Sequence, residues 1–202
     1  MTANPSPPPV PRTLPSGTVT FLFTDIEGST KLWEQHPEAM KTALAKHDSI
    51  LKEAIESNNG HVIKTTGDGV HAVFTTAIEG INAAIAAQHA LLKTSEVLET
   101  SEVWPLRVRM GLHTGEAESR DGDYYGQALN RAARIMSIGH GGQVRVSGAI
   151  PTYGFTVTCI TALSTRWSVL ITCNCTAYKP LKLLVSHSAS RPLFTGSLPS
   201  AT

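Results

Sequence analysis

The sequence predicts an α+β fold in which a ferredoxin-like βαββαβ sheet carries helices on one face. Apolar residues alternate in four short segments, which is typical of strands, and recur at helical spacing in two longer segments between them. Through Thr114 the order of these segments is β-α-β-β-α-β. A split βαβ sheet is the economical way to bury the apolar faces of these six elements.

The first strand is the run Thr18–Phe23, in which β-branched and aromatic residues alternate, and it ends at Asp25. A turn through Gly28 follows, and helix-forming residues begin at Lys31. A carboxylate at a strand end binds a hard cation, while the free N–H groups of residues 26–30 at a helix N-terminus bind an anion. This arrangement suits the triphosphate of a metal–nucleotide complex. The alternative is that Asp25 or Ser29 merely caps the helix.

A helix and two strands come next. Apolar residues at helical spacing predict a helix from Glu38 to about Asn58, which the Asn58-Asn59-Gly60 stretch ends. Residues 61–65 and 70–74 are predicted strands joined by a turn that contains Asp68, although Asp-Gly turns are common in proteins. In the predicted sheet this turn lies beside the end of the first strand. Asp25 and Asp68 can therefore meet in space although 43 positions separate them.

The remaining elements of the domain follow the capping-box pattern Thr76-x-x-Glu79, which opens a second helix. A polar loop over residues 94–105 leads to a strand over 106–113 with one buried face, and a loop over 116–125 follows. The sequence then predicts a helix from about Gly126 to Ile138 and a strand over 143–147. The apolar seam expected along this last helix consists of Leu129, Ala132, Ala133 and Met136.

Composition divides the 202 residues into three parts. Residues 1–16 form a Pro-rich leader that we expect to be disordered, 17–149 form the folded domain, and 150–202 form a Ser/Thr-rich tail that we expect to be poorly ordered or irregular. All 16 Asp and Glu residues lie at or before Asp123, so residues 1–149 carry a net charge of −3 and the tail +4.

Charge and cysteine content exclude several classes of function. The total net charge of +1 gives no indication of a nucleic-acid or membrane partner. The three cysteines have neither the number nor the spacing of a disulfide framework or a zinc site. The N-terminus has no apolar signal segment, and the cytoplasm is the expected location.

Four motifs follow one another between residues 23 and 135. They are Phe23-Thr24-Asp25-Ile26-Glu27-Gly28-Ser29-Thr30, Lys64-Thr65-Thr66-Gly67-Asp68-Gly69, Gly111-Leu112-His113-Thr114-Gly115-Glu116 and Tyr125-Gly126-Gln127-Ala128-Leu129-Asn130-Arg131-Ala132-Ala133-Arg134-Ile135. In this order they closely resemble the catalytic domain of class III nucleotidyl cyclases, the adenylate cyclase family, over roughly residues 17–149. That family has a palm-type form of the predicted sheet.

The resemblance implies a metal site. Asp25, Asp68 and the carbonyl oxygen of Ile26 would hold two Mg²⁺ or Mn²⁺ ions per site. Phosphoryl transfer requires charge neutralisation and alignment more than a reactive side chain, and two carboxylates that share two ions supply both. The phosphates of ATP would lie against the turn formed by Gly28, Ser29 and Thr30.

The resemblance also implies a second set of residues on the helix over 126–138. Asn130 and Arg134 lie four positions apart on one helix face, where a polar pair is usually only solvated surface. In the family this pair orients the ribose and stabilises charge on the α-phosphate. Arg134 suits the second role because a guanidinium matches the geometry of a phosphate.

The choice of base depends on hydrogen-bond polarity. Adenine presents an acceptor at N1 and a donor at N6, so its pocket needs a protein donor and a protein acceptor. Lys64 and Asp123 match the family's adenine-selecting positions, although alone they would be a surface strand lysine and a loop aspartate. ATP is therefore favoured over GTP. Because one chain carries both sets of residues, the resemblance implies a homodimer with two composite sites at the subunit interface.

The resemblance ends near Ala149. The family continues through a helix and a late hairpin with a phosphate-binding lysine, whereas residues 150–202 lack acidic residues and helical periodicity, with one strand-like stretch over 155–160. Two functions remain open: an adenylate cyclase that forms cyclic AMP and pyrophosphate, and a catalytically weak or inactive nucleotide-binding or dimerising module. A diguanylate cyclase is disfavoured because no Gly-Gly-(Asp/Glu)-Glu-Phe turn occurs.

Overall fold

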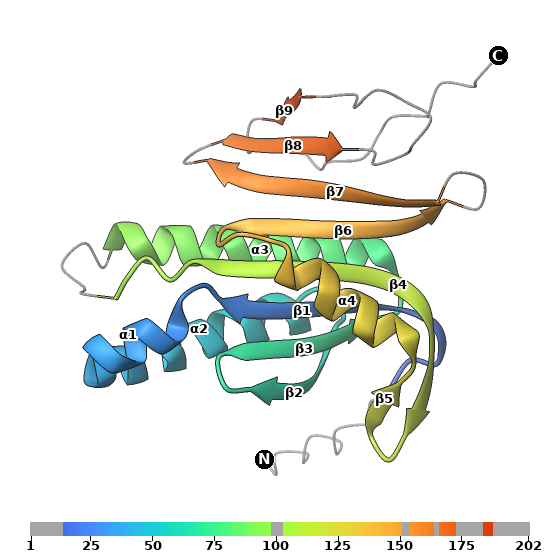
Figure 1. Ribbon diagram of the computed structural model, residues 1–202, viewed down its shortest axis with the longest axis horizontal. Coiled ribbons are helices and arrows are strands. Elements are labelled where there is room, and N and C mark those ends of the chain that lie inside the picture. Colours follow the sequence, from blue (N-terminus) through green and yellow to red (C-terminus); the bar gives the residue numbers. More distant parts are fainter. Residues whose placement is uncertain (1–13, 98–102, 151–153, 164–165, 173–183, 188–202) are drawn as a thin grey trace, which may run out of the picture.

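A computed structural model of the chain describes residues 14–97, 103–150, 154–163, 166–172 and 184–187 (Figure 1). The elements, in chain order, are β1 (Gly17–Ile26), α1 (Ser29–Gln35), α2 (Pro37–Glu56), β2 (His61–Thr66), β3 (Gly69–Phe74), α3 (Ala77–Val97), β4 (Val108–Arg120), β5 (Asp123–Tyr125), α4 (Gln127–Ser137), β6 (Gln143–Ile150), β7 (Gly154–Leu163), β8 (Arg166–Thr172) and β9 (Leu184–His187). Residues 1–13 of the predicted leader lie outside the described residues.

Strand β1 lies between β3 and β4 and pairs antiparallel with both. On the β3 side Phe23 faces His71, and on the β4 side Asp25 faces Arg109. Strand β2 lies beside β3, so the first four strands follow the order β2-β3-β1-β4. This is the strand order of a ferredoxin-like βαββαβ unit, and the predicted fold class is confirmed.

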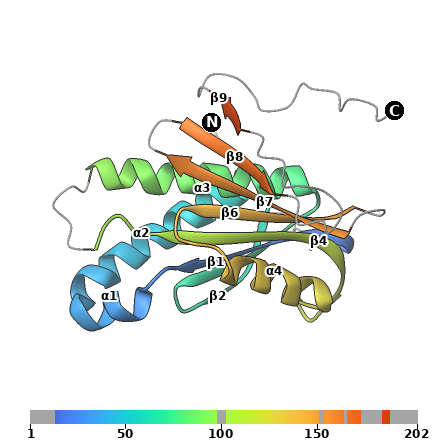
Figure 2. The same ribbon diagram turned by 45° about the horizontal axis from the view of Figure 1, so that its top comes forward.

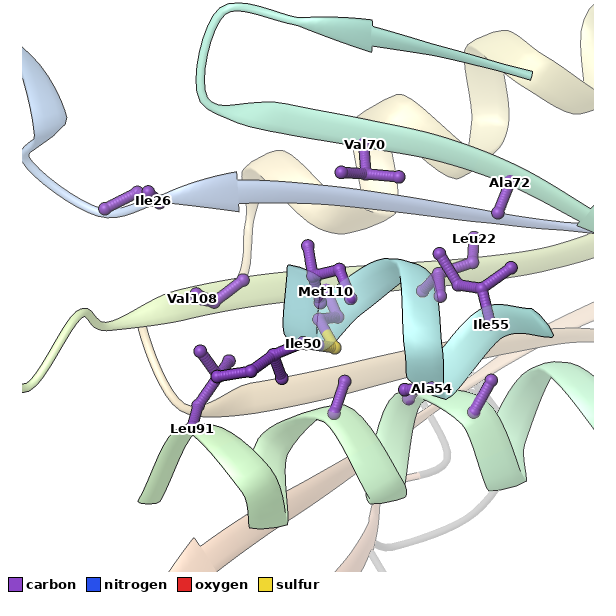
Figure 3. Close-up of a cluster of buried hydrophobic side chains, with 14 of the residues drawn as sticks. Leu22, Ile26, Ile50, Ala54, Ile55, Val70, Ala72, Leu91, Val108 and Met110 are labelled. Carbon is purple, nitrogen blue, oxygen red and sulfur yellow. The ribbon is translucent and has the colours of Figure 1, made fainter. Parts of the chain in front are cut away.

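Helices α2 and α3 cover one face of this sheet, and the larger hydrophobic core lies between them and the strands (Figure 3). Leu22 of β1 and Met110 of β4 belong to this core together with Ile55 of α2 and Leu91 of α3, and all four are buried. The two helices of the βαββαβ unit therefore lie on the same face, as the sequence predicts.

Helix α4 packs against the opposite face of the sheet (Figure 2). There Phe21 of β1, Tyr124 of β5 and Ala132 of α4 belong to a second core, in which the rings of Phe21 and Tyr124 meet edge to face at 5.3 Å between centroids. Because helices cover both faces, β1 is buried without interruption from Val19 to Thr24. The approach of α4 is close: a Cβ atom on Gly111 of β4 would lie 2.4 Å from the Met136 nitrogen.

The predicted start of α3 and the predicted end of α2 occur as expected. The Thr76–Glu79 capping box precedes α3, with the Thr76 N–H donating to the Glu79 carboxylate at 3.0 Å and the Glu79 N–H donating to Thr76 Oγ1 at 3.4 Å. After α2, Asn59 adopts a positive φ of 58°, and the Gly60 N–H donates to the Ile55 carbonyl oxygen at 2.9 Å.

The prediction of a loop over residues 116–125 is wrong. Strand β4 continues to Arg120, and β5 pairs back onto it in a hairpin whose turn, Asp121-Gly122, has positive φ at both positions. This is the usual chemistry of a tight hairpin turn. Residues 118–120 are exposed, so this part of β4 has no apolar alternation in the sequence from which a strand could be predicted.

Strand β6 pairs parallel with β4 and extends the sheet beyond the βαββαβ unit. The segments predicted as strands over 143–147 and 155–160 lie within β6 and β7. β7 then pairs antiparallel with β6, β8 with β7, and β9 with β8, within the part of the chain expected to be irregular. The rest of residues 150–202 lies outside the described residues. In the described part of the chain, no helix has both the length and the apolar character needed to cross a membrane.

Candidate active site

The end of β1 forms one side of the candidate site. Asp25 is half-buried, and after Ile26 the chain turns through Gly28, whose φ of 74° places it in the left-handed region that favours glycine. Gly28 is the N-cap residue of α1, and no side chain caps this helix. In the structure, therefore, neither Asp25 nor Ser29 caps α1 with its side chain.

The hairpin turn that carries Asp68 is fastened to the same end of β1. Thr24 Oγ1 accepts a hydrogen bond from the Val70 N–H at 3.0 Å, and a Cβ atom on Gly69 would lie 2.6 Å from the Thr24 carbonyl oxygen. The turn thus lies against the residue that precedes Asp25. Oδ2 of Asp68 is buried and has no hydrogen-bond partner among the described residues. A buried carboxylate oxygen without a partner is costly, which indicates a place for a ligand.

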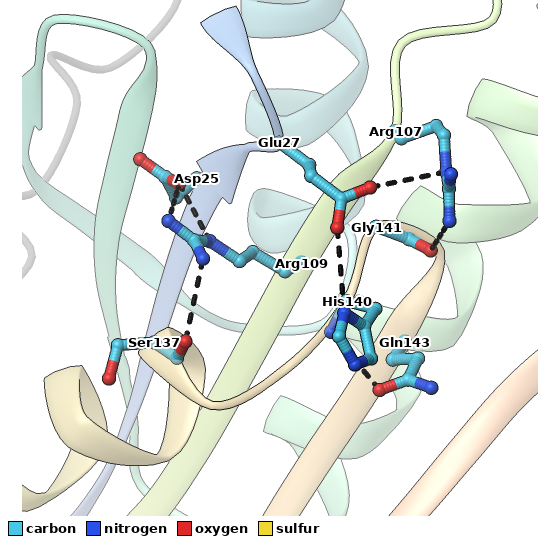
Figure 4. A network of polar contacts seen from close by, with 8 residues as sticks. All are labelled: Asp25, Glu27, Arg107, Arg109, Ser137, His140, Gly141 and Gln143. Carbon is cyan, nitrogen blue, oxygen red and sulfur yellow. Dashed lines mark hydrogen bonds and ion pairs between the residues drawn. The ribbon is translucent and has the colours of Figure 1, made fainter.

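Asp25 is paired with Arg109, a contact that the sequence did not reveal (Figure 4). Arg109 Nε and Nη2 lie 2.7 and 2.6 Å from Asp25 Oδ2, and Nη1 lies 3.4 Å from the Ser137 carbonyl oxygen at the end of α4. The polar alternation of β4 marks Arg109 as facing away from the larger core. Its partner depends on the register between β1 and β4, which only the folded chain defines.

A second polar cluster follows on the same side of the sheet (Figure 4). Glu27 Oε2 lies 3.4 Å from Arg107 Nε, and Glu27 Oε1 lies 3.6 Å from His140 Nδ1. The Glu27 N–H also donates to the Arg107 carbonyl oxygen at 2.8 Å. These contacts hold the turn after Ile26 against the connection between α4 and β6.

Lys64 and Asp123, which the sequence placed in one pocket, are in contact. Lys64 Nζ donates to Asp123 Oδ2 at 2.7 Å, although 59 positions separate the two residues. This hydrogen bond, helped by one from the Tyr124 N–H, lowers the pKa of the Asp123 carboxyl group. Their contact depends on the β4–β5 hairpin, because β5 begins at Asp123.

His71 lies next to this pair and was not predicted to be there. It faces Lys64 across the β2–β3 ladder and stacks on Phe23 with ring centroids 3.8 Å apart. Burial lowers the pKa of His71, and the positive charge of Lys64 lowers it further, while Asp123 raises it. Lys64 and Asp123 therefore lie beside an imidazole whose lowered pKa favours its neutral form.

Asn130 and Arg134 are exposed on α4. The buried side of this helix is rotated from the predicted seam: Ala128, Ala132 and Ile135 are buried, whereas Leu129, Ala133 and Met136 are half-buried. Within the described residues, no contact joins the side chain of Asn130 or Arg134 to Asp25 or Asp68. The residues predicted to act on the ribose and α-phosphate and those predicted to bind metal are therefore presented separately by one chain.

Comparison with known proteins gives one family and several relatives. The sequence profile of the adenylate and guanylate cyclase catalytic domain matches residues 12–165. An uncharacterized protein of Mycobacterium tuberculosis is 42% identical over 142 residues, which are 69% of this chain and 46% of that protein. The adenylate cyclase of Neurospora crassa is 37% identical over 154 residues, which cover 66% of this chain and 7% of that enzyme. The chain thus spans less than half the length of these relatives.

The fold also occurs among solved structures. A Trypanosoma brucei adenylate cyclase in its monomeric state superposes with a TM-score of 0.56 at 29% sequence identity, over 69% of this chain and 77% of that one. The profile match continues 16 residues beyond Ala149, where the motifs that are recognisable in the sequence end.

Proposed function

The chain belongs to the adenylate and guanylate cyclase catalytic domain family, and from this we propose that it is an adenylate cyclase. It would convert ATP into 3′,5′-cyclic AMP and pyrophosphate. The observation that carries the proposal is the contact between Lys64 and Asp123, which brings a cationic donor and an anionic acceptor together at 2.7 Å.

Lys64 and Asp123, the base-reading pair of this proposal, have the polarity that adenine requires. The Lys64 ammonium group donates to N1, and the Asp123 carboxylate accepts from the N6 amino group. Guanine presents the opposite polarity at the corresponding atoms, so it could not form the matching hydrogen bonds with Lys64 and Asp123. A site that reads a polar edge in this way discriminates strongly once the bound nucleotide covers it, because the wrong base then meets polar groups with which it cannot form hydrogen bonds.

The residues at the end of β1 fit a divalent metal. Asp25 and Asp68, with the carbonyl oxygen of Ile26, would hold two Mg²⁺ or Mn²⁺ ions, and the buried, partnerless Asp68 Oδ2 supports this assignment. No group of three His, Cys, Asp or Glu side chains gathers in the described part of the chain, so substrate phosphates would complete the ligand set. When bound, the ions would neutralise the triphosphate charge and favour ionisation of the attacking hydroxyl group.

In the reaction the ribose 3′-hydroxyl group gives up its proton to water, and its oxygen forms a bond to the α-phosphorus. The bond from that phosphorus to the bridging oxygen of the β-phosphate breaks, and pyrophosphate leaves. Gly28, Ser29 and Thr30 would hold the phosphates at the N-terminus of α1, where Gly28 is the N-cap and the other two residues begin the helix. Asn130 would orient the ribose, and Arg134 would stabilise the charge that develops on the α-phosphate. Binding and alignment by these groups account for the catalysis, because phosphoryl transfer needs little covalent chemistry from the protein.

We assign the two groups of residues to different subunits of a homodimer. Asn130 and Arg134 are exposed on α4, which packs on the face of the sheet opposite to α2 and α3. Each site would combine the metal ligands of one protomer with Asn130, Arg134 and the base-reading pair of the other. A closed two-fold dimer then contains two equivalent sites.

The test is turnover of ATP and GTP by the purified chain with Mg²⁺ or Mn²⁺. We expect cyclic AMP from ATP and at least roughly 100-fold less cyclic GMP from GTP. The double variant Lys64→Glu, Asp123→Cys reverses the polarity of the pair and should lower the ATP-to-GTP ratio by a similar factor. Lys41→Gln, which alters an exposed lysine on α2 paired with Glu38, is the matched control. An unchanged ratio in the double variant would refute the assignment of the base-reading pair.

A second candidate is a nucleotide-binding or dimerising module with little or no turnover. It is favoured by the end of the profile match at residue 165, since the family's phosphate-binding lysine has no recognisable counterpart beyond that point. This candidate predicts that the chain binds Mn²⁺–ATP in a calorimetric titration but forms no cyclic AMP. Binding together with turnover would exclude it.

A further inference from the structure

Arg109 lies between two features that the proposed function assigns to different active sites. Its Nε and Nη2 atoms contact Asp25 Oδ2 at 2.7 and 2.6 Å, and its Nη1 atom donates to the Ser137 carbonyl oxygen at 3.4 Å (Figure 4). Asp25 would bind metal in one composite site. Ser137 is the last residue of α4, the helix that would present Arg134 to the other site.

The last turn of α4 rests directly on the stretch of β4 that contains Arg109. The Met136 nitrogen would lie 2.4 Å from a Cβ atom on Gly111, two residues after Arg109 and on the same side of the strand. Ser137 Oγ in turn donates to the Arg134 carbonyl oxygen at 2.9 Å. Arg109 is thus joined to the backbone of the turn that begins at Arg134.

Electrostatics favours this arrangement at both ends of the guanidinium group. A cation at a helix C-terminus interacts favourably with the exposed carbonyl groups and the helix dipole. A planar guanidinium with several donors can serve a carboxylate and a carbonyl oxygen at once, which an ammonium group cannot do with the same geometry. Arg109 therefore links the metal-binding end of β1 to the end of α4 within one protomer.

From this geometry we infer that Arg109 is a positioning residue for the active site to which its own protomer contributes α4. It fixes the last turn of α4, so that Arg134 meets the α-phosphate bound by the partner protomer. The inference rests on the proposed composite site. Arg109 lies beside Asp25, a metal ligand of one composite site. The effect inferred here is on the other composite site, to which the same protomer contributes α4.

Mixed dimers separate this effect from any role of Arg109 beside the metal. An Asp68→Ala chain combined with an Arg134→Ala chain leaves one intact site per mixed dimer, built from the metal ligands of the second chain and α4 of the first. Arg109→Gln is then added to the Asp68→Ala chain alone. We expect kcat to fall roughly tenfold, as for a small misplacement of a catalytic group. KM for ATP should stay within about twofold, because the other chain holds the metals and phosphates.

The matched control is Lys41→Gln in the same Asp68→Ala chain. Lys41 is exposed on α2 and pairs with Glu38 at 2.8 Å, so its loss should leave kcat of the mixed dimer unchanged. An unchanged kcat in the Arg109→Gln mixed dimer would overturn the inference. Equal losses in kcat and in apparent ATP affinity would also overturn it, because they would indicate general loosening of the protein.

Hydrogen–deuterium exchange tests the inference without activity. The Ile138 and Gly139 N–H groups bond to the carbonyl oxygens of Arg134 and Met136 at 3.4 and 2.9 Å. In the Arg109→Gln chain their exchange should accelerate roughly two- to fivefold, the effect of removing a cation from a helix C-terminus. Unchanged exchange at these two amides would overturn the inference. If the starting mixed dimers form but are inactive, the composite-site proposal fails instead, and exchange alone decides the role of Arg109.

Discussion

At the scale of single residues, Asp68 was placed in its turn by the sequence and beside Asp25 by the fold. The sequence placed it in a hairpin turn, and the folded chain fastens that turn to Thr24 beside Asp25. Its buried Oδ2 atom has no partner in the described residues. Such an atom lowers stability in the absence of a ligand, and a bound metal ion would supply the missing partner.

Replacement of Asp68 by Asn should therefore separate activity from stability. We expect cyclic AMP formation to fall by roughly a hundredfold or more, because a neutral amide cannot supply the charge that the metal site needs. The thermal midpoint without metal should stay equal or rise, since the charge is removed from a half-buried side chain whose Oδ2 atom has no partner in the described residues. Asp121→Asn, in the exposed hairpin turn, is the control and should retain activity. Near-normal turnover by the Asp68→Asn chain would show that the metal assignment is wrong.

The residues that were missed share one physical property: their partners are set by strand register. Arg109 and His71 occupy polar positions of β4 and β3, and nothing in their local sequence indicates that one meets Asp25 and the other Lys64. The expectation that Lys64 and Asp123 share one pocket came only from the resemblance to a family. Local periodicity predicts which face a side chain occupies, but it does not predict the neighbour across the ladder.

At the scale of elements, the long strands and helices were predictable because each has an apolar face with a clear period. The β4–β5 hairpin was not, because its strands extend beyond the core and its residues are mainly polar. Its Asp121-Gly122 turn was nevertheless present as a signal in the sequence. The side of the sheet on which α4 lies also escaped prediction, since an amphipathic helix fits either face of a sheet whose central strand is buried on both.

The packing of α4 on Gly111 gives the prediction at this scale. Gly111→Ala should lower the free energy of unfolding by about 1–3 kcal/mol, because the new Cβ would lie 2.4 Å from the Met136 backbone nitrogen and α4 must shift. Activity should fall as well, since Arg134 moves with the helix. Denaturant unfolding and cyclic AMP formation measure the two effects.

The same strand offers a matched control for this substitution. Gly115→Ala would bring its Cβ only to 3.1 Å from the Ala128 side chain, a contact that a small adjustment relieves. It should lower stability by less than the Gly111 variant. Equal losses in the two variants would show that the backbone contact with Met136 has no special role.

At the scale of the whole molecule, three histidines carry lowered pKa values and make stability depend on pH. Burial is the largest cause for His47, His71 and His113. His113 is the clearest case, since its Nδ1 atom lies 2.5 Å from Ser147 Oγ between two parallel strands. The unfolded chain binds protons more readily at these positions, because the ordinary histidine pKa of 6.5 applies there. The three histidines therefore cost no stability above about pH 6.5. As the pH falls below 6.5, the unfolded chain takes up protons at these positions and the free energy of unfolding decreases.

We expect the His113→Gln chain to lose less stability between pH 7 and pH 5 than the parent chain. One histidine contributes at most about 1.4 kcal/mol per pH unit, and His47 and His71 retain their share. Denaturant unfolding at a series of pH values measures the slope. Ile55→Val, a core substitution that removes no ionisable group, is the control and should keep the slope of the parent. An unchanged slope in His113→Gln would contradict the assignment.

The end of the chain is the part whose arrangement the sequence indicated least. Periodicity and motifs end near Ala149, whereas β6 continues to Ile150 and pairs with β7 from Gln143–Thr161 to Ile150–Gly154. Strands can pair in this way with little alternation of apolar and polar residues. A threonine-rich segment therefore gives only a weak indication in the sequence of where its strands lie. We propose that residues beyond this pairing are not needed to build the nucleotide site, because all the site residues assigned here lie between Asp25 and Arg134.

Two truncations test this proposal. Removal of residues 166–202 keeps β7 on the edge of β6 and should retain cyclase activity within a few-fold of the full chain. The described elements from β1 to β7 should also resist protease as they do in the full chain. Removal of residues 151–202 uncovers the whole edge of β6, and an exposed edge strand pairs with other chains. This shorter chain should unfold at lower temperature and aggregate during purification. If removal of residues 166–202 alone abolishes activity while the fold persists, the end of the chain supplies a group to the phosphates, and the proposal is wrong.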